Sequence, residues 1–146
     1  AQLDYVIAAI HQSFNQSEDE IMKRLEVACK NPYVRHIAHP TGRIIGRRPG
    51  YKPNIEKLMK LAEETNTILE INANPKRLDL NAETVRKYPN VKLTINTDAH
   101  HTNHLEFMKY GVATAQKGFV TKDRVINALS REEFKSLVEN NIKLKK

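Results

Sequence analysis

The chain has 146 residues, of which 40% are hydrophobic and 28% charged, enough for one domain with a buried core. Lysine and arginine outnumber acidic residues by 24 to 17, and the resulting net charge of +7 favours polyanionic partners, nucleic acid above all. No apolar run approaches the roughly 20 residues that span a bilayer, which excludes a helical membrane protein.

Cys29 is the single cysteine, so an internal disulfide is excluded and a cytoplasmic location is favoured. It follows Val27 and Ala28 in a helical pattern, which predicts a buried thiol. The sequence begins without methionine and enters a strand pattern almost at once. We therefore expect a fragment of a longer polypeptide.

Short apolar runs rich in β-branched residues, each closed by polar or turn residues, predict four strands. These runs are residues 4–11, 34–39, 67–74 and 91–95. Helical spacing of apolar residues predicts helices between them. The predicted helical segments are residues 17–28, 54–64, 81–88, 104–118, 121–129 and a terminal segment that begins at residue 130.

Capping signals mark several of these helices. Ser17 with Glu20 and Ser130 with Glu133 have the spacing of capping boxes. Gly111 is expected to interrupt the segment 104–118. The alternation of strands and helices, with strand ends 25 to 35 residues apart, is typical of right-handed βαβ units. It predicts one α/β domain, residues 1–146, with a parallel sheet.

Polar residues fall at the carboxyl ends of all four predicted strands, which is where α/β folds build their active sites. These residues are His11, His39, Asn72, Asn74, Asp98 and His100. Imidazole and carboxylate ligands without a thiolate cluster favour zinc, manganese or iron. The sequence therefore predicts a divalent metal site whose ligands are His11, His39, Asp98 and His100.

A bound divalent metal lowers the pKa of water and neutralises phosphate oxygens, which is the chemistry of phosphoester hydrolysis. Guanidinium groups follow two of the strand ends and suit phosphate. The predicted substrate-binding residues are Arg43, Arg47, Arg48, Asn72, Asn74 and Arg77. The alternative is that the arginines form a solvated basic loop and that the histidines pack or lie on the surface. For His36 we expect packing or exposure, and for His101 and His104 a supporting role.

Four stretches together resemble the polymerase-and-histidinol-phosphatase (PHP) family, and most closely the PHP domain of bacterial family X DNA polymerases. They are DYVIAAIHQSFNQ, RHIAHPTGRIIGRR, LEINANPKRLDL and INTDAHHTNHLEFMKYGVATAQKG, and they span most of residues 4–120. The resemblance implies a distorted barrel of about seven βα units with a multinuclear metal site at the strand ends. His11 and His39 match two of its histidines, and Asp98 with His100 matches its D-x-H ligand pair.

The resemblance also implies manganese-dependent 3′–5′ exonuclease activity in DNA repair, with DNA as partner. The family's first H-x-H strand, a further histidine and a bridging glutamate have no counterpart in these residues. We therefore expect the C-terminal part of the barrel, about half of the ligands, an inactive isolated chain, and possible self-association through an open barrel edge. The rival interpretations are a histidinol-phosphatase-like enzyme and a non-catalytic basic nucleic-acid-binding module.

Overall fold

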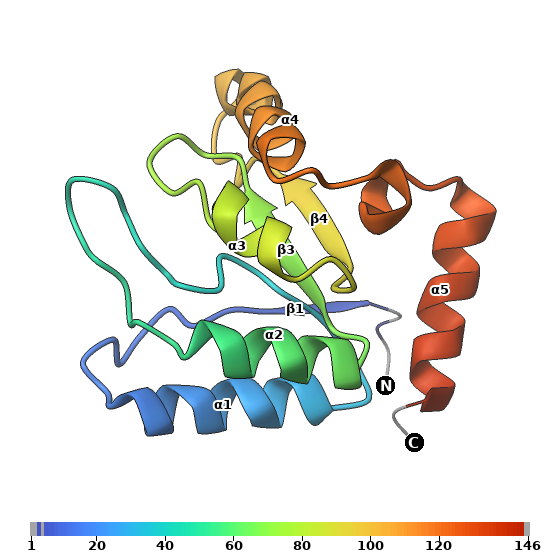
Figure 1. Cartoon of the computed structure of the whole chain (residues 1–146), viewed down its shortest axis with the longest axis horizontal. Helices are drawn as coiled ribbons and strands as arrows, with labels where there is room; N and C mark the ends of the chain where they lie inside the picture. The colour runs from blue at the N-terminus through green and yellow to red at the C-terminus, as the bar shows by residue number, and fades with distance from the viewer. Residues whose placement is uncertain (1–2, 4, 145–146) are drawn as a thin grey trace.

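The computed structural model describes residues 3 and 5–144, and its centre is a four-stranded parallel sheet of order β1-β2-β3-β4. Each strand pairs with its neighbour in sequence, and helices fill the connections (Figure 1). The predicted α/β class with four parallel strands is confirmed, and the arrangement is consistent with a partial PHP barrel. The elements are β1 (Val6–Ala8), α1 (Glu18–Lys30), β2 (Val34–Ile37), α2 (Ile55–Glu64), β3 (Ile68–Asn72), α3 (Ala82–Lys87), β4 (Leu93–Asn96), η1 (Thr102–Phe107), α4 (Met108–Lys117), η2 (Lys122–Arg124), η3 (Ile126–Ala128) and α5 (Arg131–Leu144).

Side-chain caps begin the helices where the sequence predicts them. The Ser17 hydroxyl accepts from the Glu20 backbone, and the Glu20 carboxylate accepts from the Ser17 backbone at 2.9 Å, so the capping box at α1 is confirmed. The same reciprocal pair joins Ser130 and Glu133 before α5. Each cap satisfies amide groups that a helix start leaves without a partner.

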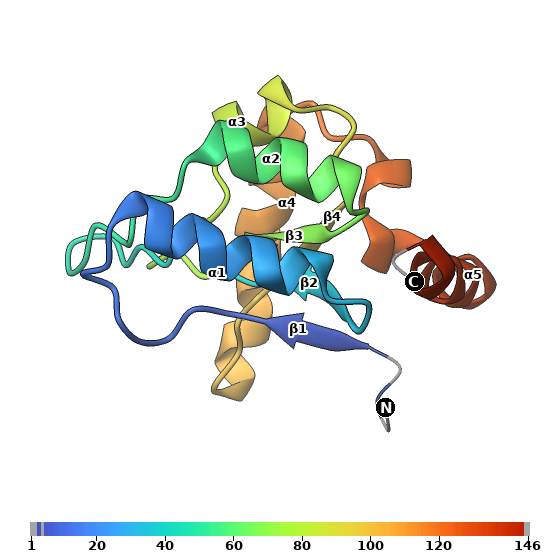
Figure 2. The same ribbon diagram turned by 90° about the horizontal axis from the view of Figure 1, so that it is seen from below.

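The helices bury their apolar stripes against the sheet. Helices α1 and α2 lie side by side in Figure 1, and their contact places Ile21, Leu25 and Leu58 in the core. Turning the molecule by 90° (Figure 2) shows both helices on the same side of β1, with α1 between β1 and α2. The Cys29 thiol is buried beside them, as predicted. Helix α4 packs on α3, β3 and β4.

The strands are shorter than the sequence predicts. The first ends at Ala8 rather than at His11, and Asp4 lies outside the described residues. The second ends at Ile37 rather than at His39. The alternating apolar residues continue past the last residue that pairs with a neighbouring strand. The predicted strands therefore include loop residues that follow the observed ones. As a result His11 and His39 are held by loops at the edge of the sheet.

Strand β1 pairs only with β2 among the described residues, and its Ile7 side chain is 54% exposed. Self-association through this edge stays a prediction. In the part of the chain that the structure describes, no helix is long and apolar enough to cross a bilayer.

Gly111 does not interrupt a helix, contrary to the prediction. Helix α4 runs through it, because the missing side chain lets the helix approach the sheet. A Cβ at this position would lie 2.4 Å from Ile95 Cγ2 and 2.7 Å from Ala73 Cβ. Gly111 therefore sets the distance between α4 and the ends of β3 and β4.

Replacing Gly111 by valine is expected to lower the free energy of unfolding by about 2 to 3 kcal/mol, because the new side chain overpacks the contact with Ile95. Urea denaturation measures the change. Ala113→Val is the matched control, since Ala113 is exposed on the same helix and carries the same β-branched penalty. Equal losses in the two variants would contradict the close-approach argument.

Candidate active site

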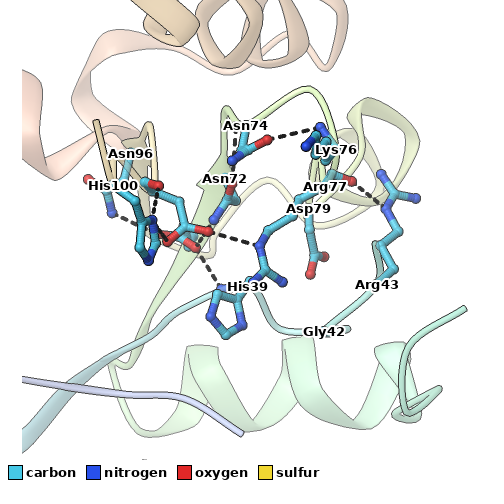
Figure 3. A network of polar contacts seen from close by, with 12 residues as sticks. His39, Gly42, Arg43, Asn72, Asn74, Lys76, Arg77, Asp79, Asn96 and His100 are labelled. Atoms are coloured by element: carbon cyan, nitrogen blue, oxygen red, sulfur yellow. Dashed lines mark hydrogen bonds and ion pairs between the residues drawn. The ribbon is translucent and has the colours of Figure 1, made fainter. Parts of the chain in front are cut away.

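The candidate site lies at the carboxyl end of the sheet, beyond the arrowheads of β3 and β4 in Figure 1. Loops after all four strands supply its side chains. Figure 3 shows His39, Arg77, Asn96 and His100 close to the strand ends, each belonging to a network of hydrogen bonds and ion pairs that passes through the carboxylates of Glu70 and Asp98. The edge that the sequence predicts for the site is therefore where its polar residues meet.

The structure brings His11 and His39 together although 28 residues separate them. Their Nε2 atoms are 3.3 Å apart, and the two rings stack with centroids at 5.2 Å. Two nitrogen ligands on one ion, each about 2.1 Å from it, lie roughly 3.0 to 3.4 Å apart. The spacing of the two Nε2 atoms thus matches that of two ligands of one metal ion.

His39 is held in the neutral form that a metal ligand needs. Burial, and next the positive charge of Arg77, lower the pKa of His39 to about 4, while the Asp98 carboxylate partly opposes this shift. The ring nitrogen Nδ1 of His39 is buried and has no hydrogen-bond partner. At neutral pH the imidazole is uncharged and has a lone pair available.

Asp98 and His100 form a second cluster on the loop after β4. The Asp98 carboxylate accepts from Arg77 Nε at 2.8 Å. The His100 ring lies 3.9 Å from the same carboxylate, and its Nδ1 is 2.8 Å from the Asp98 backbone carbonyl. A hydrogen bond from Nδ1 to a carbonyl fixes the tautomer in which Nε2 is unprotonated, as metal-binding histidines commonly show. His100 itself is largely exposed.

The backbone is strained at two predicted ligands. His39 has a φ of 33° and Asp98 a φ of 54°, in the left-handed region that most side chains avoid. Such strain costs of order 1 to 3 kcal/mol and concentrates at functional sites. Both residues lie in the loops that directly follow β2 and β4.

These residues fit a metal in part. The His11–His39 pair offers two converging nitrogens, but Arg77 occupies one oxygen of Asp98. Within residues 3 and 5–144, no group of three or more His, Cys, Asp or Glu side chains is arranged to hold a metal ion. The structure thus brings His11 to His39 and Asp98 to His100, and a metal site formed by all four residues stays a prediction.

The four predicted phosphate-binding arginines differ in their surroundings. Arg43 donates to the backbone carbonyls of Arg77 and Leu78, which orders the loop. Arg48 donates to the Gly42 carbonyl and lies over the Phe14 ring at 3.9 Å. Arg47 is exposed. The structure therefore shows contacts within the fold for Arg43, Arg48 and, through Asp98, Arg77, and phosphate binding by the four arginines stays a prediction.

The two predicted asparagines also serve the fold. Asn72 is fully buried, and its side-chain carbonyl accepts from the backbone of Asn74 at 3.0 Å. The Asn74 side chain in turn accepts from the backbone of Lys76 at 3.0 Å. Both asparagines therefore stabilise the turn that carries Arg77. Contact of either asparagine with a substrate stays a prediction.

Sequence reasoning missed Glu70, the buried carboxylate beneath the site. It accepts from the His39 backbone at 2.7 Å and from the side-chain amides of Asn72 and Asn96, both at 3.0 Å. Burial raises its pKa. The sequence feature that could have revealed Glu70 is its place as a single charged residue inside an apolar strand pattern. It lies two residues before Asn72 and therefore on the same face of the strand.

A second missed carboxylate is Asp79. It is fully buried, and one of its oxygens accepts from the Thr41 backbone at 2.9 Å. Burial raises its pKa. It joins the loop after β2 to the turn after β3, so that the two loops that carry His39 and Arg77 are fixed to each other.

His36 is buried in β2, which confirms packing rather than exposure. Its Nε2 lies 2.9 Å from the Thr94 hydroxyl, and that oxygen accepts from the Asn96 amide at 3.2 Å. Burial, followed by the charge of His39, lowers the pKa of His36 to about 4. The neutral ring can therefore accept a hydrogen bond from the Thr94 hydroxyl.

The stability of the protein is expected to depend on pH through His36. Its pKa is lower in the folded state than the ordinary value of 6.5, so its contribution is complete above pH 6.5 and is lost as the pH falls toward 4. The loss is at most about 3 kcal/mol. Urea denaturation between pH 7 and pH 4 should show a flatter dependence for His36→Gln. Parallel curves for the two proteins would contradict this assignment.

Comparison with known proteins tests the predicted family resemblance. The chain is 52% identical over 143 residues, or 97% of its length, to the DNA polymerase/3'-5' exonuclease PolX of Bacillus subtilis (strain 168). The predicted resemblance to the PHP region of a family X DNA polymerase is confirmed. The chain is also 28% identical over 137 residues to a probable phosphatase of Thermoanaerobacter sp. (strain X514), and 40% identical over 74 residues to one of Caldanaerobacter subterraneus subsp. tengcongensis.

The chain spans only part of each relative. It covers 25% of PolX and 54% of the Thermoanaerobacter phosphatase, whereas these matches include 97% and 86% of the chain. No family model matches the chain. The names of PolX and the phosphatases share phosphoester hydrolysis, which supports a phosphoesterase-like role for this chain.

Proposed function

We propose that this chain forms the C-terminal part of a metal-dependent phosphoesterase that shortens DNA from its 3′ end in a family X DNA polymerase with a repair role. The observation that carries the proposal is the pair of converging nitrogens on His11 and His39 at the carboxyl edge of the sheet. The high identity to a polymerase/3'-5' exonuclease supports DNA as substrate. The excess of positive charge agrees with it.

His11 and His39 would hold the metal, with Asp98 and His100 adding ligands from the opposite loop. Manganese fits nitrogen and carboxylate donors, and zinc or iron are the other candidates. When bound, the ion supplies an activated water and neutralises phosphate charge. Residues beyond these 146 would complete the ligand set.

The residues of the chain have separate tasks in this scheme. The imidazole of His39 is neutral at pH 7, and its Nε2 lies 3.3 Å from the Nε2 of His11. Arg77 orients the Asp98 carboxylate through its Nε, and its positive charge attracts phosphate to the site. Glu70 holds the His39 backbone in place. These side chains thus position the ion and the phosphate rather than transfer protons.

The second candidate function is hydrolysis of a small phosphate ester, which the similarity to probable phosphatases favours. The two are separated by exchanging the matched segment of Bacillus subtilis PolX for this chain. With Mn²⁺, the exchanged protein is expected to shorten a labelled single-stranded oligonucleotide and to leave histidinol phosphate intact. Hydrolysis of histidinol phosphate alone would favour the phosphatase, and no hydrolysis of either would contradict both.

A further inference from the structure

Four aromatic rings form a continuous row along η1 and the start of α4. They belong to His101, His104, Phe107 and Tyr110, which are spaced three residues apart. Neighbouring ring centroids are 6.1, 4.8 and 6.2 Å apart in chain order. The row forms because η1 is a 3-10 helix, in which side chains three residues apart lie directly above one another.

The row begins at the candidate site and leads away from it. His101 is the N-cap of η1, directly after the predicted ligand His100. The His100 backbone donates to the His104 ring at 3.2 Å, which fixes the start of the row to the loop of Asp98. His104 and Phe107 stack with an interplanar angle of 19° and support Tyr110, which is 41% exposed.

Tyr110 lines a groove of about 370 Å³ between α4 and α3, a volume in the range of small-ligand sites. The lining of the groove includes the apolar residues Leu78 and Ala113 and the cationic residues Arg43 and Lys117. A further cation, Lys109 Nζ, is 5.3 Å from the centre of the Tyr110 ring. A stacking ring beside cations is the combination that binds single strands.

The charge of this surface favours a polyanion. Residues 99–117 contain one carboxylate, Glu106, against two lysines. Aromatic stacking tolerates any base, and the lysines can neutralise the phosphates that join successive nucleotides. The row provides a stacking surface and the groove provides positive charge, which are the two requirements for binding single-stranded DNA. Both lie outside the candidate metal site.

We propose that the row from His101 to Tyr110, with the groove beside it, is a subsite for single-stranded DNA, and that an unpaired base stacks on Tyr110. This inference rests on the proposed function, because it supplies the path by which a strand leaves the candidate site. The competing occupant is a protein, since Leu105, Met108 and Val112 are exposed on the same segment. The cations at the groove favour DNA over a protein as the occupant of this surface.

The test is fluorescence anisotropy of a labelled oligothymidylate titrated with the 146-residue chain, in EDTA so that no cleavage intervenes. Tyr110→Ala is expected to weaken binding roughly tenfold, and Tyr110→Phe to retain it. Tyr33→Ala is the matched control, because Tyr33 is 42% exposed but lies in the connection between α1 and β2. Tyr110→Leu, which keeps apolar bulk without a ring, should bind like Tyr110→Ala.

A second ligand separates stacking from charge. An oligonucleotide of abasic sites keeps the phosphates, so wild type and Tyr110→Ala should bind it equally. Equal affinity of these two proteins for oligothymidylate would overturn the subsite and favour a protein partner on the exposed apolar residues. Because binding is measured without metal, this result is independent of whether the exchanged PolX cleaves DNA.

Discussion

Replacing Glu70 by alanine is expected to lower the free energy of unfolding by about 3 to 5 kcal/mol and the melting temperature by about 10 °C or more. The carboxylate is 4% exposed and accepts three hydrogen bonds. Its removal leaves the His39 backbone and the Asn72 amide without this buried acceptor, and leaves the Asn96 amide with its bond to Thr94. Thermal denaturation followed by circular dichroism measures the effect.

Two controls separate this network from a general loss of charge. Glu70→Gln keeps the shape but directs an amide toward one of the donors, so an intermediate loss is expected. Glu64→Ala removes an exposed carboxylate at the end of α2 and should change little. Equal stability of Glu70→Ala and Glu64→Ala would show that the carboxylate of Glu70 does not hold the site together.

His39→Gln should reduce oligonucleotide cleavage by the exchanged PolX at least about 100-fold at a fixed Mn²⁺ concentration. The substitution keeps a polar side chain but removes the nitrogen that lies 3.3 Å from His11. The readout is the initial rate of shortening of a 3′-overhanging strand. Higher Mn²⁺ should restore part of the rate, because the defect is in metal binding.

The polymerase activity of the exchanged PolX is the control for this experiment. PolX is named as a polymerase as well as an exonuclease, so nucleotide addition by the exchanged protein reports on its folding and DNA binding. Addition should be unchanged in His39→Gln. An exonuclease rate close to that of the wild-type exchange would remove His39 from the site. Parallel loss of both activities would indicate misfolding instead.

Local patterns in the sequence were sufficient for the sheet and for much of the candidate site. The four strand runs and the capping residues Ser17 and Ser130 depend on neighbours in sequence, and they lie close to where the sequence predicts them. The pairing of His11 with His39 follows from parallel strands that end at the same edge. These features needed no knowledge of tertiary contacts.

The remaining features depend on contacts that a sequence does not display. Arg43 has the chemistry of a phosphate ligand, but the turn after β3 presents carbonyls to it. Glu70 is buried only because β2 and β4 flank its strand. Gly111 has the lowest helix propensity of any residue except proline, yet close packing on Ile95 outweighs that preference. In each case the outcome depends on tertiary packing, which local sequence patterns do not show.

Calorimetric titration of Mn²⁺ into the purified chain tests the central claim most directly. The account predicts weak binding by the wild-type chain that is lost in both His11→Gln and His39→Gln, because the two Nε2 atoms bind one ion together. His36→Gln, in which a buried histidine is removed from β2 ahead of the His39 loop, should still bind. Absence of binding at millimolar Mn²⁺, or equal binding by wild type and His39→Gln, would contradict the account.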